Sequence, residues 1–520
     1  MKKLSEFFLI FRSYFLLFLA AFILSGLTVN PSLAGALDKT GTLWSPHIEW
    51  NFENPTYSGN PFDLIASATF THTASGATHT TEMFYDNANT WKFRFTATKT
   101  GAWSFTTSSN DPDLDGKSGT VTITSNPNTE IKGFLQSHGN KFARQIGENG
   151  ELEGFLFNVY MDNNAFPHNG NLALYSDVNF INAYIQDAQQ YGFNTIFLPV
   201  NNEWFKLGAN RYTDHSSENP DIQTFEILEQ IITTAHSQGV NFHMWAWGDE
   251  SRKWTPIGVG GINGIPDRRL QRYIAARLGP LPGWTMGYGF DLQEWVSESQ
   301  VGEWAQYMKA RMGWQHLLMA RGRVHAELDV KSYSGLKAHS YEEAVSNMNS
   351  DSSRPHFFEE RDLYTRFGNT MDVTRQHLWQ YTLAGGHGGF WGILWNGGPL
   401  YPNPEQLLTF DQFWKNRFLL NMGRANNLTD GYGLKTPDNT NYVFYKENTN
   451  SIQMLLSGMS GSQPAIAIDT KKAYKIVSLG MLSASNQIWT APYISDWAIG
   501  VGDFEVDIIA PIAPSNLIVE

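Results

Sequence analysis

The chain has 520 residues, a net charge of −13 at pH 7 and no cysteine, and aromatic residues make up 14% of it. Nucleic acids and anionic membrane surfaces require a basic binding face, so this charge argues against both as partners. A chain without cysteine has no disulfide, no thiol nucleophile and no thiolate metal ligand. Aromatic rings fill hydrophobic cores, and exposed rings also bind the apolar faces of sugars.

The first segment has the pattern of an export signal. Three basic residues precede the apolar run YFLLFLAAFILSGL (14–27), and the small residues AGA follow at 34–36. This order predicts a signal peptide over residues 1–36, cleaved near Ala36. A retained membrane anchor is the alternative, but a spanning helix needs ~18 consecutive apolar residues and Ser25 interrupts the run. We therefore expect a secreted, periplasmic or cell-surface protein with no membrane contact after cleavage.

Residues 37–127 alternate between apolar and polar side chains. The runs FDLIASATFTHT (62–73) and WKFRFTATKTGAWSFTTS (91–108) have this period of two, and Gly, Asn, Asp and Ser clusters separate such runs. Short alternating strands at this spacing predict a β-sandwich of immunoglobulin-like (Ig-like) type. Nothing in this region has the pattern of a catalytic site.

Over residues 128–424, strand-like apolar runs alternate with amphipathic helical stretches. The eight predicted strands cover residues 153–161, 194–200, 241–250, 285–295, 316–322, 334–340, 354–360 and 388–395. Predicted helices follow most of them, and the last helix is expected over residues 411–423. Alternating strands and helices indicate a parallel sheet, and eight such units predict a (β/α)8 barrel, or TIM barrel.

The remaining sequence returns to short alternating strands over residues 425–510, which predicts a small C-terminal β-sandwich domain. Residues 511–520 contain two prolines and are expected to form a linker or the start of a further module. The predicted fold class is therefore multidomain α/β, with the central barrel between two β-domains.

The predicted barrel directs the search for a catalytic site, because active sites of this fold lie at the carboxyl ends of the strands. Glu294 ends the fourth predicted strand, and the doublet Glu359–Glu360 ends the seventh. Two such carboxylates form the pair that glycoside hydrolysis needs. Successive strand residues point to opposite sides, so only one member of the doublet can face the mouth. We favour Glu359 as the nucleophile, with Glu360 as the alternative. The non-functional explanation of this tripeptide is an ordinary solvated Glu-Glu-Arg turn.

Other polar and aromatic residues lie at or near predicted strand ends and are candidate substrate-binding residues, although each could equally belong to the core. They are Asn158, Tyr160, Asn201, Asn202, Trp204, Trp245, Trp247, Asp249, Tyr288, Asp291, Gln293, Trp295, Arg321, His339, Arg361, His387, Trp391 and Trp395. Together they predict a cleft lined with indole rings and amides, as a sugar-binding site requires. Arg361 is also a candidate for keeping the nucleophile ionised.

No metal or other cofactor is expected. The separated histidines show no HxH or HExxH spacing, so the sequence gives no zinc motif. The glycine-rich run GVGGING (258–264) lacks the lysine or downstream acid of a nucleotide-binding loop and is expected to form a rim loop of the barrel.

The order of an Ig-like module, a barrel and a small β-domain resembles bacterial polysaccharide-degrading glycoside hydrolases of the large clan with a retaining mechanism. WKFRFTATKTGAWSFTT resembles their N-terminal domain of unknown function, and DVTRQHLWQYTLAGGHGGFWG (372–392) resembles the strand 7 to strand 8 segment of apiosidase-like and agarase-like barrels. The resemblance implies Glu294 as the acid/base and Glu359 as the nucleophile. This chain has Gln293 where the family more often has asparagine.

The expected function is hydrolysis of O-glycosidic bonds in a polysaccharide or oligosaccharide by a retaining mechanism. Arg252, Arg268, Arg269 and Arg321 lie near the predicted mouth, which raises the hypothesis of an anionic, sulfated or uronic substrate. Two alternatives stay open from the sequence: a carbohydrate-binding protein without catalysis, and a polysaccharide lyase, which would need a Tyr, His or Lys base.

Overall fold

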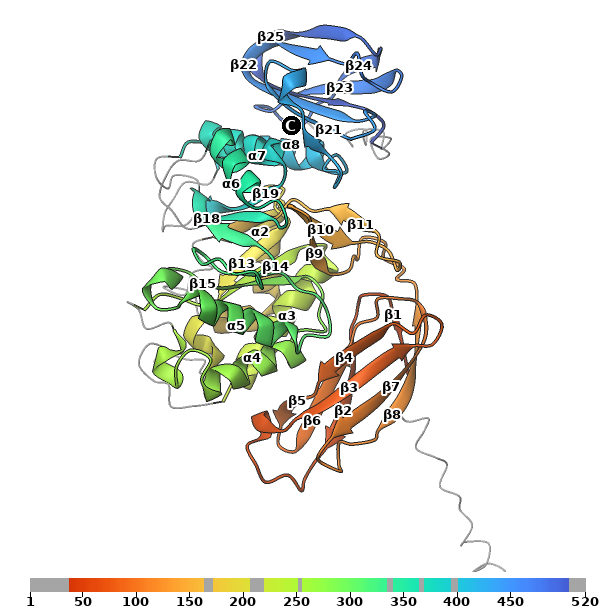
Figure 1. The fold of residues 1–520 in the computed structure, drawn as a ribbon, viewed down its shortest axis with the longest axis vertical. Helices are drawn as coiled ribbons and strands as arrows, with labels where there is room; N and C mark the ends of the chain where they lie inside the picture. The colour runs from red at the N-terminus through yellow and green to blue at the C-terminus, as the bar shows by residue number, and fades with distance from the viewer. Residues whose placement is uncertain are drawn as a thin grey trace, which may run out of the picture.

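The computed structural model describes residues 37–162, 172–205, 219–250, 255–333, 340–363, 369–393 and 401–504. Within these ranges, β-sheet domains lie at both ends, and the α-helices lie between them around a parallel barrel (Figure 1). The predicted signal peptide and the predicted linker at 511–520 lie outside these ranges. No helix of the described residues is long and apolar enough to cross a membrane.

Two antiparallel-rich sheets form the N-terminal domain. One contains β1 (Lys39–Thr42), β8 (Ser118–Thr124), β7 (Gly101–Ser109), β3 (Ala66–His72) and β4 (Thr78–Glu82) in that order, and the other contains β2 (Ile48–Glu53), β6 (Thr90–Phe95) and β5 (Phe84–Asn87). The Trp50 ring lies 5.0 Å from Phe93 of its own sheet and 5.0 Å from Phe105 of the other. The two sheets therefore share one core, which explains the period of two in this region.

A three-stranded antiparallel sheet, which the sequence pattern did not predict, precedes the barrel. It consists of β9 (Leu135–His138), β10 (Lys141–Gln145) and β11 (Leu152–Gly154). Leu135 and Phe142 belong to the core cluster inside the barrel, and the Phe142 ring stacks on Phe157 at 4.8 Å. The sheet thus closes the end of the barrel where the strands begin. The predicted first strand at 153–161 is wrong in extent, because a break separates β11 from the first barrel strand.

Eight parallel strands form a nearly closed barrel. They are β12 (Asn158–Asp162), β13 (Thr195–Pro199), β14 (Asn241–Trp247), β15 (Trp284–Gly289), β16 (Leu318–Met319), β17 (Lys331–Tyr333), β18 (His356–Leu363) and β19 (His387–Ile393). The sheet order runs β16-β15-β14-β13-β12-β19-β18-β17. Between the end strands β16 and β17, a single parallel bridge joins Arg321 to Ser332.

Seven α-helices of the described residues connect and cover the strands. They are α2 (Val178–Gln189), α3 (Ile222–Ser237), α4 (Ile265–Arg277), α5 (Glu298–Lys309), α6 (Tyr341–Ser350), α7 (Met371–Ala384) and α8 (Pro404–Trp414). The side chains of Asp177, Asp221 and Ser297 accept backbone N–H groups at the starts of α2, α3 and α5, which caps these helices. The last predicted helix is wrong: it begins at Pro404, a favoured first-turn residue, and ends at Trp414.

Two predicted barrel strands also need correction. The fourth ends at Gly289 instead of continuing to residue 295, because Asp291 has a left-handed backbone with φ 49° that interrupts the extended conformation. The sixth lies at Lys331–Tyr333 instead of 334–340, and residues 334–339 lie outside the described ranges.

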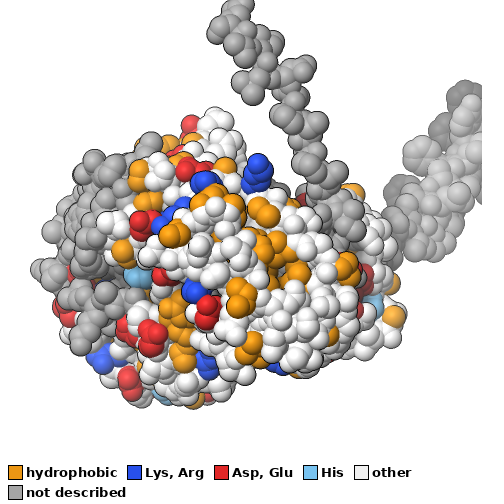
Figure 2. Space-filling view, turned by 90° about the horizontal axis from the view of Figure 1, so that it is seen from above, with side chains coloured by type: hydrophobic (Ala, Val, Ile, Leu, Met, Phe, Trp, Pro, Cys, Tyr) orange, Lys and Arg blue, Asp and Glu red, His pale blue; other side chains and the backbone are white. Residues whose placement is uncertain are grey.

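The C-terminal domain is a six-stranded antiparallel sheet. Its order is β20 (Gly423–Arg424), β21 (Tyr432–Lys435), β22 (Tyr442–Leu455), β25 (Asn486–Val501), β23 (Gln463–Asp469) and β24 (Val477–Leu482). The ladder between the long strands β22 and β25 is interrupted by bulges. Ile452 of β22 and Trp497 of β25 belong to the same hydrophobic core. Figure 2 looks onto this end of the molecule and shows apolar side chains scattered among uncharged ones.

The N-terminal domain is docked on the helix layer of the barrel through a buried ion network. Arg94 donates to the Glu229 carboxylate of α3 at 2.7 Å, and Arg277 of α4 also binds Glu229. Burial alone would raise the pKa of Glu229, but the two guanidiniums outweigh it and hold the pKa at about 2, below its ordinary value of 4.5. Glu229 therefore stabilises the folded chain while it is ionised.

We expect Glu229→Gln to destabilise the protein by about 1–3 kcal/mol at pH 7, because it removes the carboxylate that the two buried guanidiniums share and leaves Arg94 with Glu49 and Arg277 with Asp86. The depressed pKa means that the wild-type advantage is complete above about pH 4.5 and is lost as the pH falls toward 2. Calorimetric unfolding temperatures at pH 7, 4 and 3 measure this trend. Glu226→Gln, at an exposed position of the same helix, is the control. A gap between wild type and Glu229→Gln that stays constant over this pH range would contradict the prediction.

Candidate functional site

The barrel strands alternate between residues that face the barrel interior and residues that face the helices. Phe157, Phe197, His243 and Phe357 meet inside the barrel: the Phe157 ring lies 5.6 Å from His243 and 5.1 Å from Phe357. Residue Phe358, the neighbour of Phe357, packs instead among the residues of the helix layer. Every second residue of each strand therefore belongs to the interior.

Glu359 continues the interior face of β18 beyond Phe357, and its side chain is 0% exposed. The pairing of β18 with β19 shifts here: Phe358 pairs with Gly389, but the next pair is Asp362 with Trp391. Three residues, 359–361, thus oppose one residue of β19, which is a bulge of the kind often found beside active sites. The side chains of Glu360 and Arg361 lie outside the description. The Glu359 carboxylate is therefore the first polar group beyond the apolar side chains on the interior face of β18.

Trp245 is the large side chain on the interior face of β14, and it crosses β15 at a glycine. A Cβ atom at Gly287 would lie 2.6 Å from Cδ1 of Trp245. Phe290, just beyond the end of β15, packs against the same indole at 4.9 Å. The pattern GYG at 287–289 thus leaves room on the interior face of β15 for a fully buried indole.

Arg321 and Asp291 lie over this indole. The Arg321 Cζ atom lies 6.0 Å from the centre of the Trp245 ring, and its Nη2 atom lies 3.5 Å from Asp291 Oδ1. The Arg321 side chain is 10% exposed and that of Asp291 is 33% exposed. We refer to Trp245, Phe290, Asp291 and Arg321 as the mouth cluster, because these residues lie at the strand ends where substrates bind in barrel enzymes.

Glu294 lies beyond the end of β15, in a 3₁₀ turn (η7, Leu292–Glu294), and its side chain is exposed. Its backbone N–H donates to the carbonyl of Asp291 at 3.0 Å. The Trp295 indole donates to the carbonyl of Gly248 at 3.0 Å, which ties the turn to the segment after β14. The predicted acid is therefore on a mouth turn rather than on the strand itself, and Gln293 beside it is also exposed.

Two asparagines follow β13 in another 3₁₀ turn (η5, Asn201–Trp204). Asn201 has a left-handed backbone with φ 53°, and Asn201 and Asn202 are both buried. Among the described residues, the Asn201 side-chain amide has no hydrogen-bond partner. Asp249, beyond the end of β14, is also buried. These residues lie at the mouth end of the barrel.

Four predicted binding residues lie away from the mouth. Tyr160 faces the helices, where its ring packs 5.6 Å from Phe193. Asn158, at the start of β12, accepts the Trp391 indole N–H at 3.1 Å on that same outer face. His387, at the start of β19, is bonded to the carbonyl of Ala344 in α6 at 3.0 Å. These positions correct the expectation that Asn158, Tyr160, His387 and Trp391 line a mouth cleft.

Four further aromatic residues are core components. The Trp204 indole donates to the carbonyl of Ala246, Trp247 stacks on Phe205, and Tyr288 and Trp295 pack together outside β15. Their rings are at most 9% exposed, so burial, not sugar contact, accounts for them. The predicted residues His339 and Trp395 lie outside the described ranges.

The predicted arginine cluster is not assembled at the mouth. Arg269 of α4 donates to Asp63 of the N-terminal domain at 2.7 Å, and Arg268 lies over the Tyr307 ring of α5 at 4.2 Å. Both side chains are therefore engaged on the helix layer, and Arg252 lies outside the described residues. Of the four arginines, Arg321 is the one in the mouth cluster.

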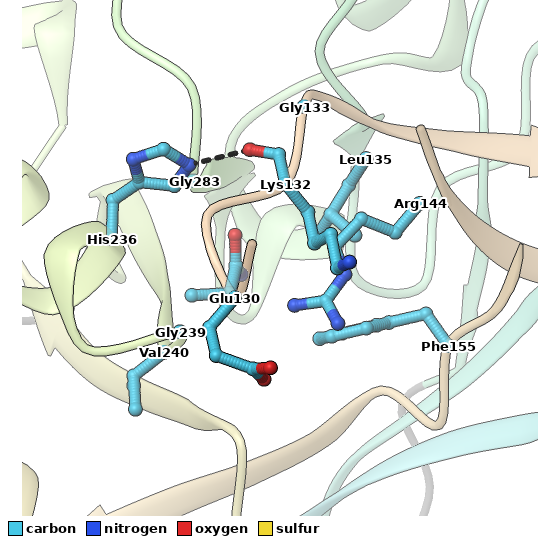
Figure 3. A pocket seen from close by; sticks show the side chains of 11 residues that line it. Glu130, Lys132, Gly133, Leu135, Arg144, Phe155, His236, Gly239, Val240 and Gly283 are labelled. Carbon is cyan, nitrogen blue, oxygen red and sulfur yellow. Dashed lines mark hydrogen bonds between the residues drawn. The ribbon is translucent and has the colours of Figure 1, made fainter. Parts of the chain in front are cut away.

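A small pocket lies at the opposite end of the barrel (Figure 3). Lys132, Arg144, Phe155 and His236 are among its lining residues, and His236 bonds the carbonyl of Lys132 at 2.8 Å. Burial holds the pKa of His236 at about 4, so this ring is neutral and donates that bond. The pocket lies where strands begin, so it is not the place of catalysis in this fold. No group of three potential metal ligands occurs among the described residues.

The amino-acid sequence matches one family over part of its length. Residues 43–110, which lie in the N-terminal β-sheets, match a domain of unknown function, DUF5060. No curated protein matches the sequence.

Solved structures of glycoside hydrolases have a similar fold. A presumed glycoside hydrolase from Bacteroides vulgatus has a TM-score of 0.65 at 14% identity, over 89% of this chain and 100% of its own. A family 5 glycoside hydrolase from the same organism has a TM-score of 0.55 at 12% identity, over 73% and 95%. A further glycoside hydrolase has a TM-score of 0.54 at 14% identity, over 71% and 97%. At these identities the likeness concerns the fold alone.

We expect Gly287→Ala to disturb the mouth cluster, because the added methyl group would overlap the Trp245 indole. Overpacking of this kind costs about 1–3 kcal/mol, and the displaced ring would change its near-ultraviolet circular dichroism. Denaturant unfolding and the dichroism spectrum measure the two effects. Gly423→Ala is the matched control, because a Cβ atom there meets nothing within 4 Å. Equal stability of both variants would refute this account of Gly287.

Proposed function

We propose that this protein is a glycoside hydrolase that cleaves O-glycosidic bonds of a polysaccharide or oligosaccharide with retention of configuration. The observation that carries the proposal is the fully buried Glu359, which follows the apolar interior of a parallel barrel on its seventh strand. The similarity of the fold to glycoside hydrolases supports the same assignment. The proposal does not require a cofactor.

In the proposed mechanism, a Glu359 carboxylate oxygen attacks the anomeric carbon while Glu294 gives its proton to the departing glycosidic oxygen. The bond to the leaving sugar breaks as the glycosyl–Glu359 ester forms. Glu294, now a carboxylate, then takes a proton from water, and the water oxygen displaces Glu359 from the anomeric carbon. The second step leaves Glu294 protonated, as the next cycle requires.

The mouth cluster supports a sugar substrate. An arginine and a carboxylate 3.5 Å apart offer donors and acceptors for hydroxyl groups, beside the buried aromatic rings of Trp245 and Phe290. An anionic substrate has less support than the sequence predicted, because Arg321 already faces Asp291 and the arginines of α4 bind elsewhere.

We also propose that the chain is exported, as its first 36 residues predict, and that the N-terminal domain is of Ig-like type. Two sheets that share one aromatic core support the second assignment. An exported enzyme without cysteine depends on core burial for its stability, and the barrel and the two β-domains supply large cores.

The test is digestion of a glycan panel by the wild type and by two variants, Glu359→Gln and Glu294→Gln. We expect Glu294→Gln to lower kcat by about 10²–10⁴-fold, the usual contribution of general acid–base catalysis. Glu359→Gln should abolish turnover, because an amide cannot form the glycosyl ester. Proton NMR of the first product should show the same anomer as the substrate.

Glu360→Gln is the matched control, since it makes the same change at the adjacent residue and should keep near wild-type activity. The alternatives have distinct outcomes. Glycan binding without turnover, unaffected by Glu359→Gln, would indicate a binding protein, and an unsaturated product that absorbs ultraviolet light would indicate a lyase.

A further inference from the structure

A short segment of the N-terminal domain lies at the mouth end of two barrel helices. It comprises Asn60 and the 3₁₀ turn η2 (Pro61–Asp63). The Asn60 amide donates to the Asn219 side-chain oxygen, just before α3, at 2.9 Å. Asp63 accepts two hydrogen bonds from Arg269, in the first half of α4, both at 2.7 Å. Helices α3 and α4 follow parallel strands and so begin at the mouth, which places this segment beside the rim.

Phe62 anchors the segment in the helix layer. Its side chain is 8% exposed and belongs to the core cluster of the barrel rather than to that of its own domain. The ring lies 5.0 Å from Tyr273 of α4 and 5.3 Å from Tyr85 of β5. In Figure 1, strand β5 lies beside α4, in agreement with this contact. A buried aromatic residue between two charged or polar contacts holds the segment in one position.

The first barrel residue that the segment contacts is tied to the turn that carries Asn201 and Asn202. The backbone N–H of Asp221, two residues after Asn219, donates to the carbonyl of Trp204 at 2.7 Å. The Thr224 hydroxyl donates to the carbonyl of Glu203 at 2.7 Å. A displacement of Asn219 would therefore act directly on the turn η5 at the mouth.

The second contact leads to the rim loop after β14. Asp267, two residues before Arg269, is fully buried and accepts the backbone N–H of Asn263 at 2.8 Å and the Gln271 amide at 3.0 Å. These bonds fix the end of the glycine-rich loop to α4. The N-terminal domain thus contacts the supports of two neighbouring mouth loops, one through Asn60 and the other through Asp63.

We propose that Asn60 and Asp63 are positioning residues for the barrel mouth, so that the N-terminal domain holds the turn η5 after β13 and residues 261–264 before α4 in the geometry that binds substrate. This gives a role to a segment that lies within the matched domain of unknown function. The positioning role is structural and stands on the contacts; its effect on substrate binding rests on the proposed function.

The test compares Asn60→Ala/Asp63→Asn with the wild type by hydrogen–deuterium exchange of the full chain, without any ligand. We expect about fivefold faster exchange of backbone amides in residues 219–225 and 261–270, the size that loss of one or two hydrogen bonds produces. The rest of the interface should exchange as in the wild type. Exchange as slow as the wild type in both segments would overturn the proposal.

Glu49→Gln is the matched control. Glu49 accepts a hydrogen bond from Arg94 at 2.8 Å in the same docking interface, and the other hydrogen bonds of Arg94 go to Glu229 and the carbonyl of Arg277, not to the mouth-side segment. It should leave residues 219–225 and 261–270 unchanged. Equal acceleration of both segments by this control would reduce Asn60 and Asp63 to ordinary docking contacts and overturn the proposal.

Kinetics on the glycan that the panel identifies give the second readout. The double variant should raise KM about fivefold with little change in kcat. Asp63→Glu in the otherwise wild-type chain keeps the carboxylate and should have the KM of the wild type. A change in kcat alone would contradict positioning of the substrate. If the wild type cleaves no glycan of the panel, the proposed function fails, and the exchange comparison still decides the positioning role.

Discussion

The alternation of side chains along parallel strands is the constraint on which the candidate site depends. Because every second residue of a barrel strand faces the interior, the carboxylate of Glu359 occupies the position that follows Phe357 on that face. The same rule places Trp245 inside and leaves Gly287 opposite it as the space for the indole. The mouth cluster is thus the uppermost part of the barrel filling, with polar atoms in place of apolar ones.

The periodicity of the sequence predicts that eight parallel strands alternate with helices, because strands and helices have different repeats. Strand ends are harder to predict. Nothing in GYGFDLQEW indicates that Asp291 leaves the extended conformation, and the predicted strand therefore ran past its true end at Gly289. Residues 155–157 belong to an apolar run, so the sequence likewise does not indicate the break between β11 and β12.

Site residues were predicted from their types, and this explains which of them were misplaced. Tyr160 and Trp391 are large aromatic residues on barrel strands, as Trp245 is. Their positions in the alternation along the strand direct them toward the helices instead of the barrel interior. Burial cannot separate the two faces, because both sides of a parallel barrel wall are covered. Arg269 was misplaced for a different reason: its partner Asp63 comes from another domain, and no local pattern reveals a contact across 206 residues of sequence.

Helix α4 joins these observations, since one of its faces packs on the barrel while the other binds the N-terminal domain through Arg269, Arg272 and Arg277. A helix so constrained transmits the position of one domain to the other, and its first turn supports a mouth loop. The ion network at Glu229 and the segment around Phe62 therefore belong to one docking surface that extends along the whole helix.

The closure of the barrel by one bridge between Arg321 and Ser332 gives its wall a seam. Elsewhere neighbouring strands are joined by ladders of at least two residue pairs. Across the seam, the Gly322 N–H donates to the carbonyl of Ser332 at 3.3 Å and the Asp329 N–H to the carbonyl of Leu318 at 2.9 Å. One side of the seam is the arginine of the mouth cluster. A shift of the wall along this seam would therefore move the Arg321 guanidinium together with the entrance of the barrel.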